Sequence, residues 1–379
     1  MVEPIEPSIG RKRPRWGRRF FVGLIVAALL AVSIPVSLVL LSWGRVERVP
    51  FHPGAAREQL GTATTTAEGG PVLTDPAAPS SATAEFPDPP FNVTWVATTV
   101  TGAIHPAPPP VPVSPRIPDS AHQAILVVGS DRPIGATRRA DVIMLALIPS
   151  DGSNPLLVSV PRDLYLDNPC GGGRERINAA LNGCGAVSGP DLLAVAIEDF
   201  TGIPVDHYVV FDFDGFARVI DAAGGVEVCV DHPTFDTNTT PDLNLPAGCS
   251  TLDGRMALSW VRSRKTRQMV DGVERSVPGV GDHTRQARQR QVVLQMIQRL
   301  SGYSSPAQIV SLAQSLPGAF VLDSGLSLTG AVGIAWDLRG RAGSIRTPTI
   351  AVTSYTTADG AWVALPTRPF AETIGWGAG

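Results

Sequence analysis

The chain has 379 residues, which is too long for one average domain and short for three. Its 31 basic and 34 acidic residues give a net charge of −3, so the overall charge does not indicate a nucleic-acid partner. Six histidines, with no HExxH motif and no Cys/His pairing at zinc spacing, argue against a zinc enzyme.

The N-terminus combines a basic block with an apolar run. Six cations lie between Arg11 and Arg19, and residues 20–43 contain no charged side chain. As a helix this run extends about 36 Å, which is enough to cross a bilayer. The positive-inside rule then predicts a cytoplasmic tail over 1–19, a transmembrane helix over 20–43 and an extracytoplasmic remainder. A cleavable signal peptide is the alternative, but the apolar run is longer than a typical signal-peptide core, which favours an uncleaved anchor.

Residues 44–121 are rich in Pro, Ala, Thr and Gly. Such a composition cannot bury a core, so it predicts an extended extracytoplasmic linker. The folded domain is expected over 122–379, with helical patterns at 189–201, 212–223, 306–316 and 326–336, and strand patterns at 207–211, 226–230, 345–352 and 361–365. Since helices alternate with strands, the pattern predicts an α/β layered fold.

Three further strands, at 124–128, 142–148 and 156–160, open the folded part. If neighbouring strands run antiparallel, Asp131, Asp141, Arg162 and Asp163 converge at one edge of the sheet. Arg138 and Arg139 lie just before Asp141. Carboxylates beside arginines suit a hard cation such as Mg²⁺ that bridges to a phosphate. The alternative, taken residue by residue, is ordinary loop charge.

A second arginine cluster lies between residues 252 and 300. Asp253 is expected to cap a short helix through residue 260, and a basic turn with Arg262 and Arg264 follows. Asp282 is expected to cap a long helix whose first two turns carry Arg285, Arg288 and Arg290. Cations there oppose the helix dipole, which indicates that they face an anion, and a planar guanidinium matches phosphate oxygens. A solvated basic face is the alternative.

All four cysteines lie beyond residue 169. Four cysteines allow three pairings. Local spacing and an extracytoplasmic, oxidising setting favour the pairs Cys170–Cys184 and Cys229–Cys249.

Taken in order, several motifs resemble the LytR-CpsA-Psr family of bacterial cell-wall ligases. No single motif is specific, but their order over about residues 122–300 is. They are GSDR at 129–132, RAD at 139–141, SVPRD at 159–163, RINAA at 176–180, DHYVVFDFDGF at 206–216, DAAGGVEV at 221–228, LPAG at 245–248, LDGRMAL at 252–258, VRSR at 261–264 and DHTRQARQ at 282–289.

The resemblance implies a transferase that moves a glycopolymer from a polyprenyl-pyrophosphate carrier to peptidoglycan outside the membrane. It implies a central, mostly antiparallel sheet between helices, giving a layered α-β-α domain, with residues 301–379 completing it. Asp131 and Asp141 would hold Mg²⁺. The pyrophosphate would be bound by Arg139, Arg162, Arg176, Arg262, Arg264 and Arg285, with Arg288 and Gln289 in the same motif.

The chain departs from the family pattern at three positions. Arg176 stands where the family has Lys, Val142 where it has Thr, and Arg290 where it has Gln. These departures affect details of phosphate contact. Asp131 and Asp163 are candidates for the general base. A non-catalytic module that binds polyprenyl phosphate or wall polymer is the alternative function, and a polyprenyl-pyrophosphate hydrolase is a third.

Overall fold

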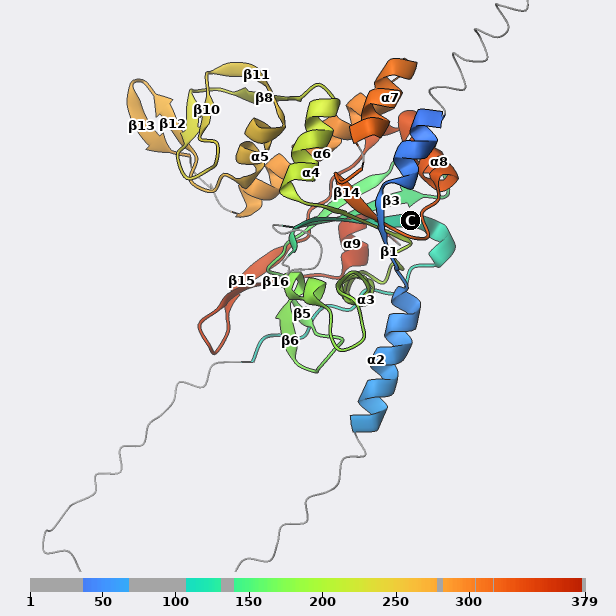
Figure 1. The fold of residues 1–379 in the computed structure, drawn as a ribbon. Helices are drawn as coiled ribbons and strands as arrows, with labels where there is room; N and C mark the ends of the chain where they lie inside the picture. Colours follow the sequence, from blue (N-terminus) through green and yellow to red (C-terminus); the bar gives the residue numbers. More distant parts are fainter. Residues whose placement is uncertain are drawn as a thin grey trace, which may run out of the picture. The chain divides into compact units, whose positions relative to one another are not determined.

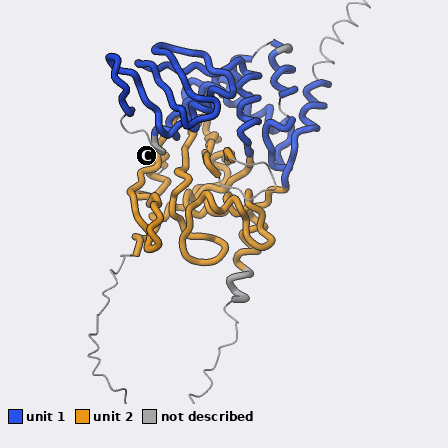
Figure 2. Tube along the Cα trace, turned by 60° about the vertical axis from the view of Figure 1, so that its left-hand side comes forward, with its two compact units in different colours: residues 1–49, 209–344 blue, residues 50–208, 345–379 orange. Residues whose placement is uncertain are grey.

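A computed structural model of the chain describes residues 37–67, 107–130, 140–277, 282–303, 305–315 and 317–376. The chain divides into two units, coloured separately in Figure 2: unit 1 is residues 1–49 and 209–344, and unit 2 is residues 50–208 and 345–379. Both units combine helices with strands (Figure 1), so the predicted mixed α/β fold with a central sheet is confirmed.

Three consecutive antiparallel strands form the sheet of unit 2: β2 (His122–Ser130), β3 (Ala140–Pro149) and β4 (Leu156–Val160). All three strands were predicted, and so was their antiparallel order. Their near-continuous apolar sequence follows from burial, since Leu126 and Leu145 have no exposed surface.

Helix α3 (Gly189–Thr201) spans the residues that its sequence predicted. The Ser188 side chain caps it by accepting a hydrogen bond from the Asp191 N–H, and Gly202 ends it with a positive φ. The remaining elements of unit 2 are α2 (Pro53–Ala67), η1 (Asp119–Ala121), β5 (Tyr165–Asp167), β6 (Arg174–Arg176), η2 (Ile177–Asn182), β15 (Val352–Thr356), β16 (Trp362–Pro366) and α9 (Phe370–Ile374).

Unit 1 has its own strands and an apolar core beside them. Strand β14 (Phe320–Asp323) pairs in parallel with β1 (Glu47–Val49) and antiparallel with the unit 1 part of β7 (His207–Phe211). Helices α4 (Phe213–Ala222), α5 (Gly254–Arg262) and α6 (Asp282–Ser301) contribute to one buried cluster, which includes Val292 and Met296 of α6. The other elements are β8 (Val226–Val230), β9 (Thr234–Asp236), β10 (Leu243–Leu245), β11 (Gly248–Leu252), β12 (Arg267–Val270), β13 (Val273–Ser276), α7 (Pro306–Ser315), α8 (Leu328–Arg339) and η3 (Ala342–Ser344).

The described residues of the segment 44–121, which was predicted to be an extended linker, include regular elements. They are β1, α2 and η1. Helix α2 has no strong apolar stripe, which is why its sequence did not reveal it. It buries Ala56 and Leu60 in a cluster with residues of α3, and Arg57 forms ion pairs with Glu198 at 3.0 Å and Asp199 at 2.6 Å.

The predicted strand 345–352 differs from the structure. Arg346 and Thr349 each make an isolated parallel bridge to β4, and the regular strand β15 begins only at Val352. Pro348 lies between the two bridges and has no N–H to donate, so a continuous ladder cannot form there. Strands β15 and β16 pair with each other as a separate two-stranded sheet.

Both predicted disulfides, Cys170–Cys184 and Cys229–Cys249, are present. Most of the proposed transmembrane span, residues 20–36, lies outside the described residues. Its last part belongs to a helical stretch over residues 37–44. Within the described part of the chain, we find no helix with the length and apolar character needed to cross a membrane.

Candidate functional site

Asp141 and Arg162 lie side by side in unit 2. Asp141 is the second residue of β3, Arg162 follows β4 by two residues, and the antiparallel register pairs Ile143 with Val160. The Arg162 guanidinium donates a hydrogen bond to Oδ1 of Asp141. The predicted convergence is therefore confirmed for these two residues, whereas Asp131 and Arg139 lie outside the described residues.

The pair continues into a chain of alternating charges. Nε of Arg162 lies 3.4 Å from one oxygen of Asp163, and Nε of Arg176 lies 3.6 Å from the other. Arg176 also donates to the Trp362 carbonyl at 2.6 Å. Asp141, Arg162, Asp163 and Arg176 together form what we call the β3–β4 charge cluster. Their side chains are 15–36% exposed, so the cluster is accessible to a ligand and only partly screened by water.

Local structure holds Arg176 in this cluster. It ends β6, which pairs with β5 so that Arg176 faces Tyr165. The next two residues are tied to the backbone before β5, because the N–H of Asn178 donates to the Arg162 carbonyl at 3.2 Å. The Cys170–Cys184 disulfide joins the turn of this hairpin to the residues after η2. The RINAA motif therefore fixes Arg176 relative to Arg162.

In unit 1, a buried carboxylate organises the residues that follow α5. Asp236 is 2% exposed and accepts hydrogen bonds from Oγ of Ser263 at 2.6 Å and the N–H of Lys265 at 3.2 Å. Burial alone raises the pKa of Asp236, but the hydrogen bonds from Ser263, Asn238 and Lys265 outweigh it and lower the pKa. We call residues 262–266 the α5 turn. Sequence reasoning missed Asp236, since its partners lie almost 30 residues away.

The arginines of the α5 turn are exposed. The Asp253 side chain caps α5 as predicted, by accepting from the Met256 N–H at 2.8 Å. The helix ends at Arg262, whose guanidinium lies 4.1 Å above the Phe213 ring. Arg264 is exposed on the same turn. Both guanidiniums are therefore open to an anionic ligand.

The motif residues of α6 are buried instead. Arg285, Arg288 and Gln289 are 4%, 6% and 8% exposed. The Arg288 guanidinium lies 3.9 Å above the Trp260 ring and 3.5 Å from the Ser263 carbonyl. Burial lowers the pKa of Arg288 to about 10, against the attraction of Asp236. Arg288 is thus a desolvated cation that packs on Trp260 and contacts the backbone of the α5 turn at Ser263. Helix α6 begins at Asp282, and the predicted capping role of Asp282 depends on a side chain that lies outside the described residues.

Comparison with known proteins supports the resemblance seen in the motifs. The sequence profile of the LytR_cpsA_psr family matches residues 106–373. The chain belongs to this family. Its curated relatives include the probable cell wall biosynthesis protein LcpB of Corynebacterium glutamicum, 32% identical over 255 residues, which cover 66% of this chain and 55% of the relative.

Another member is the polyisoprenyl-teichoic acid–peptidoglycan teichoic acid transferase TagU of Oceanobacillus iheyensis. It is 32% identical over 183 residues, which cover 48% of this chain and 52% of that protein. The chain therefore matches only about half the length of these curated relatives.

Among solved structures, the chain resembles the LytR-Csp2A-Psr enzyme from Actinomyces oris. The TM-score is 0.56 with 26% identity, and the match covers 72% of this chain and 95% of that one. Bacillus subtilis TagV gives a TM-score of 0.54 with 25% identity, covering 68% of this chain and 94% of that one. These family structures share the mixed α/β fold with a central sheet.

Proposed function

We propose that this chain is a membrane-anchored, extracytoplasmic phosphotransferase that moves a glycopolymer from a polyprenyl-pyrophosphate carrier onto peptidoglycan, assisted by Mg²⁺. The β3–β4 charge cluster is the observation that carries this proposal, because it alternates carboxylates with guanidiniums in one accessible array. The names of relatives, a teichoic acid transferase acting with peptidoglycan and a cell wall biosynthesis protein, support the same class of reaction.

The reaction breaks a phosphoanhydride bond and forms a phosphate ester. A hydroxyl of peptidoglycan attacks the phosphorus that is bonded to the glycan. The bond from that phosphorus to the bridging oxygen breaks, polyprenyl phosphate leaves and the hydroxyl proton passes to a base. Such transfers depend mainly on positioning and on stabilising negative charge. Arg162 and Arg176 would bind phosphate oxygens through their guanidinium groups.

The carboxylate of Asp141 suits a hard cation. It is 28% exposed, and carboxylate oxygens are the ligands that Mg²⁺ prefers. Asp131, the other proposed ligand, lies outside the described residues. When bound, Mg²⁺ would neutralise charge on the pyrophosphate. Arg162 would keep the Asp141 carboxylate oriented through the hydrogen bond that it donates.

The arginines of unit 1 would bind phosphate in two ways. Arg262 and Arg264 present exposed guanidiniums, which bind phosphate oxygens in a bidentate manner. Arg285 and Arg288 are buried cations, and a cation in a low-dielectric setting attracts an anion more strongly than one in water. Gln289 is placed to support the turn, since its Nε2 lies 3.5 Å from the Val261 carbonyl.

Membrane anchoring is proposed from the basic block and the apolar run over 20–43. N-terminal sequencing of protein extracted from membranes tests it. We expect the mature chain to retain residues 1–43. A mature chain that begins after residue 43 would show a cleaved signal peptide instead.

The transfer itself is tested with the full chain in detergent, a short polyprenyl-pyrophosphate disaccharide and soluble peptidoglycan oligomers. We expect disaccharide phosphate on the oligomers and an equal amount of polyprenyl phosphate, with loss of both products in EDTA. A hydrolase would release disaccharide phosphate without any oligomer present. A binding module would retain the substrate and form no product.

A further inference from the structure

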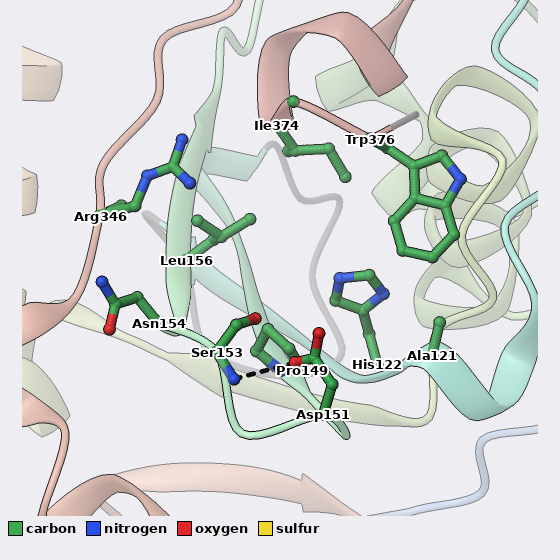
Figure 3. A pocket seen from close by; sticks show the side chains of 11 residues that line it. Ala121, His122, Pro149, Asp151, Ser153, Asn154, Leu156, Arg346, Ile374 and Trp376 are labelled. Carbon is green, nitrogen blue, oxygen red and sulfur yellow. Dashed lines mark hydrogen bonds between the residues drawn. The ribbon is translucent and has the colours of Figure 1, made fainter. Parts of the chain in front are cut away.

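Unit 2 contains a cavity of about 300 Å³ that is separate from the β3–β4 charge cluster. It lies between the start of β2, the turn that joins β3 to β4, and the chain after α9 (Figure 3). Pro149 at its edge is eight residues along β3 from Asp141, which corresponds to about 27 Å of extended strand. The cavity therefore lies at the opposite end of the same strands.

Backbone hydrogen bonds hold the walls of the cavity. The N–H of Ser150 donates to the Ala121 carbonyl at 3.0 Å, which fixes the turn to the start of β2. The carboxylate of Asp151 accepts from the N–H of Ser153 at 2.9 Å within the turn. Arg346 is held on β4 by two backbone bonds of 2.9 Å. Walls fixed in this way do not have to be ordered when a ligand binds.

Trp376 covers one side of the cavity and is also fixed. Helix α9 is anchored by Phe370, which has no exposed surface. It ends at Gly375, whose φ of 76° lets the chain reverse, and the N–H of Trp376 then donates to the Ala371 carbonyl at 2.9 Å. The indole remains 39% exposed and lies 5.4 Å, centroid to centroid, from the His122 ring.

His122 supplies an unsatisfied polar atom to this cavity. It is 9% exposed, and its buried Nδ1 has no hydrogen-bond partner. Its ring rises from the floor of the cavity toward Ile374 and Trp376 (Figure 3). Burial lowers the pKa of His122, although Asp151 opposes the shift, so the imidazole is neutral at pH 7. A neutral imidazole has one donor and one acceptor, and a buried ring nitrogen left without a partner is costly.

The groups around the cavity match the chemistry of a sugar ring. Trp376, Ile374 and Leu156 form apolar walls, whereas Asp151 accepts hydrogen bonds and the Arg346 side chain donates them. A pyranose has apolar C–H faces that pack on an indole, and its hydroxyls both donate and accept. A carboxylate in the ligand would be repelled by the negative charge of Asp151, whose pKa is lowered by the backbone hydrogen bond from Ser153.

We propose that this cavity is a saccharide subsite that binds one pyranose ring of a glycan chain. This inference goes beyond the proposed function and does not depend on the transfer step. The glycan has two possible sources, the peptidoglycan backbone with its acetamido sugars and the transferred polymer. A second, non-reacting contact of this kind would raise the overall affinity of the protein for a long glycan without changing the chemistry.

Calorimetric titration of the full chain in detergent tests the subsite. The probes are the β-1,4 tetramer of N-acetylglucosamine and the β-1,4 tetramer of glucose. We expect one of them to bind, and Trp376→Ala to weaken that binding by at least about tenfold, as expected for a lost aromatic wall. Asp151→Asn keeps the acceptor of the turn but removes its charge, and it is expected to weaken binding about threefold or more, because a neutral hydrogen bond contributes less than a charged one.

Trp336→Ala is the matched control, because Trp336 is a 71% exposed indole on α8 of unit 1. It should bind the probe with wild-type affinity. Preference for the acetamido tetramer assigns the subsite to peptidoglycan, and preference for the glucose tetramer assigns it to the transferred polymer. The proposal is overturned if neither tetramer binds, or if folded Trp376→Ala and Asp151→Asn both bind like the wild type. The transfer assay on Trp376→Ala, with a disaccharide donor, should still give product, so failure of the subsite and of the transferase are distinguishable.

Discussion

Replacing Asp141 with Asn separates the catalytic role of the β3–β4 charge cluster from its contribution to stability. The ion pair with Arg162 is 28% and 20% exposed on its two sides. The contribution of this ion pair to the free energy of unfolding therefore lies between the roughly 0.2 to 1 kcal/mol of an exposed pair and the roughly 3 to 5 kcal/mol lost when a buried pair is broken. Because the Asn oxygen still accepts from Arg162, we expect a loss of about 1 kcal/mol in the free energy of unfolding.

A loss of that size lowers the melting temperature by only about 2–4 °C in a domain of this length. The transfer rate, by contrast, is expected to fall about 100-fold or more, as when a charge-stabilising group is removed from a transition state. An amide oxygen is also a weaker Mg²⁺ ligand than a carboxylate. Thermal melting and the transfer assay, run over a series of Mg²⁺ concentrations, measure the two effects on one preparation.

Asp167→Asn is the matched control for this experiment. Asp167 pairs with Arg174 at 3.0 Å in the same unit and is 77% exposed. We expect its loss to change the free energy of unfolding by less than about 0.5 kcal/mol and to leave the transfer rate unchanged. The reasoning fails if Asp141→Asn transfers at the wild-type rate with the same Mg²⁺ dependence, or if both variants lose activity equally.

Three other experiments test individual statements. Arg264→Lys keeps the charge but loses the planar fork, so it should weaken binding of polyprenyl pyrophosphate by roughly 1–3 kcal/mol, whereas Arg290→Ala should bind like the wild type; equal affinities would show that Arg264 does not bind the pyrophosphate. Gly215→Ala places a Cβ 1.6 Å from a backbone oxygen, so denaturant unfolding should show a loss of at least about 2 kcal/mol, while Gly333→Ala, with open space around it, should stabilise α8 by up to about 1 kcal/mol. Because the pKa of Asp236 is lowered in the folded protein, the ionised carboxylate stabilises the fold at pH values above its unfolded pKa near 3.8, and this stabilisation is lost as pH falls through the folded pKa. Asp236→Asn should therefore be less stable at pH 7 and show a shallower loss of stability on acidification below about pH 4. Identical acid melting curves for the two proteins would contradict this.

Local patterns in the sequence were sufficient for the regular elements that have strong signals. The apolar runs of β2, β3 and β4 and the helical pattern at 189–201 predicted their elements directly, and the antiparallel register then brought Asp141 to Arg162. Helix α2 was missed because tertiary contacts stabilise it, namely the burial of Ala56 and Leu60 against α3 and the ion pairs of Arg57 with α3. Its own sequence is rich in Ala, Thr and Gly.

The candidate site was predicted less completely than the fold. The sequence identified Arg262, Arg264 and Arg288 as one basic group, but it could not show that Arg288 is buried over Trp260 while Arg264 is exposed. Asp236 escaped notice since a carboxylate at a strand end has no local signal for partners 27 residues away in the chain. The pocket formed by His122 and Trp376 joins two distant segments, so periodicity could not indicate it either.

The fate of the two phosphorus atoms of the donor tests the central claim most directly. We would label the phosphorus next to the glycan and the phosphorus next to the lipid with different isotopes and incubate the full chain with peptidoglycan oligomers and Mg²⁺. The proposed reaction predicts that the glycan-side label appears on peptidoglycan and the lipid-side label in polyprenyl phosphate, in equal amounts. Recovery of the glycan-side label in free glycan phosphate, or of both labels in unreacted donor, would contradict it.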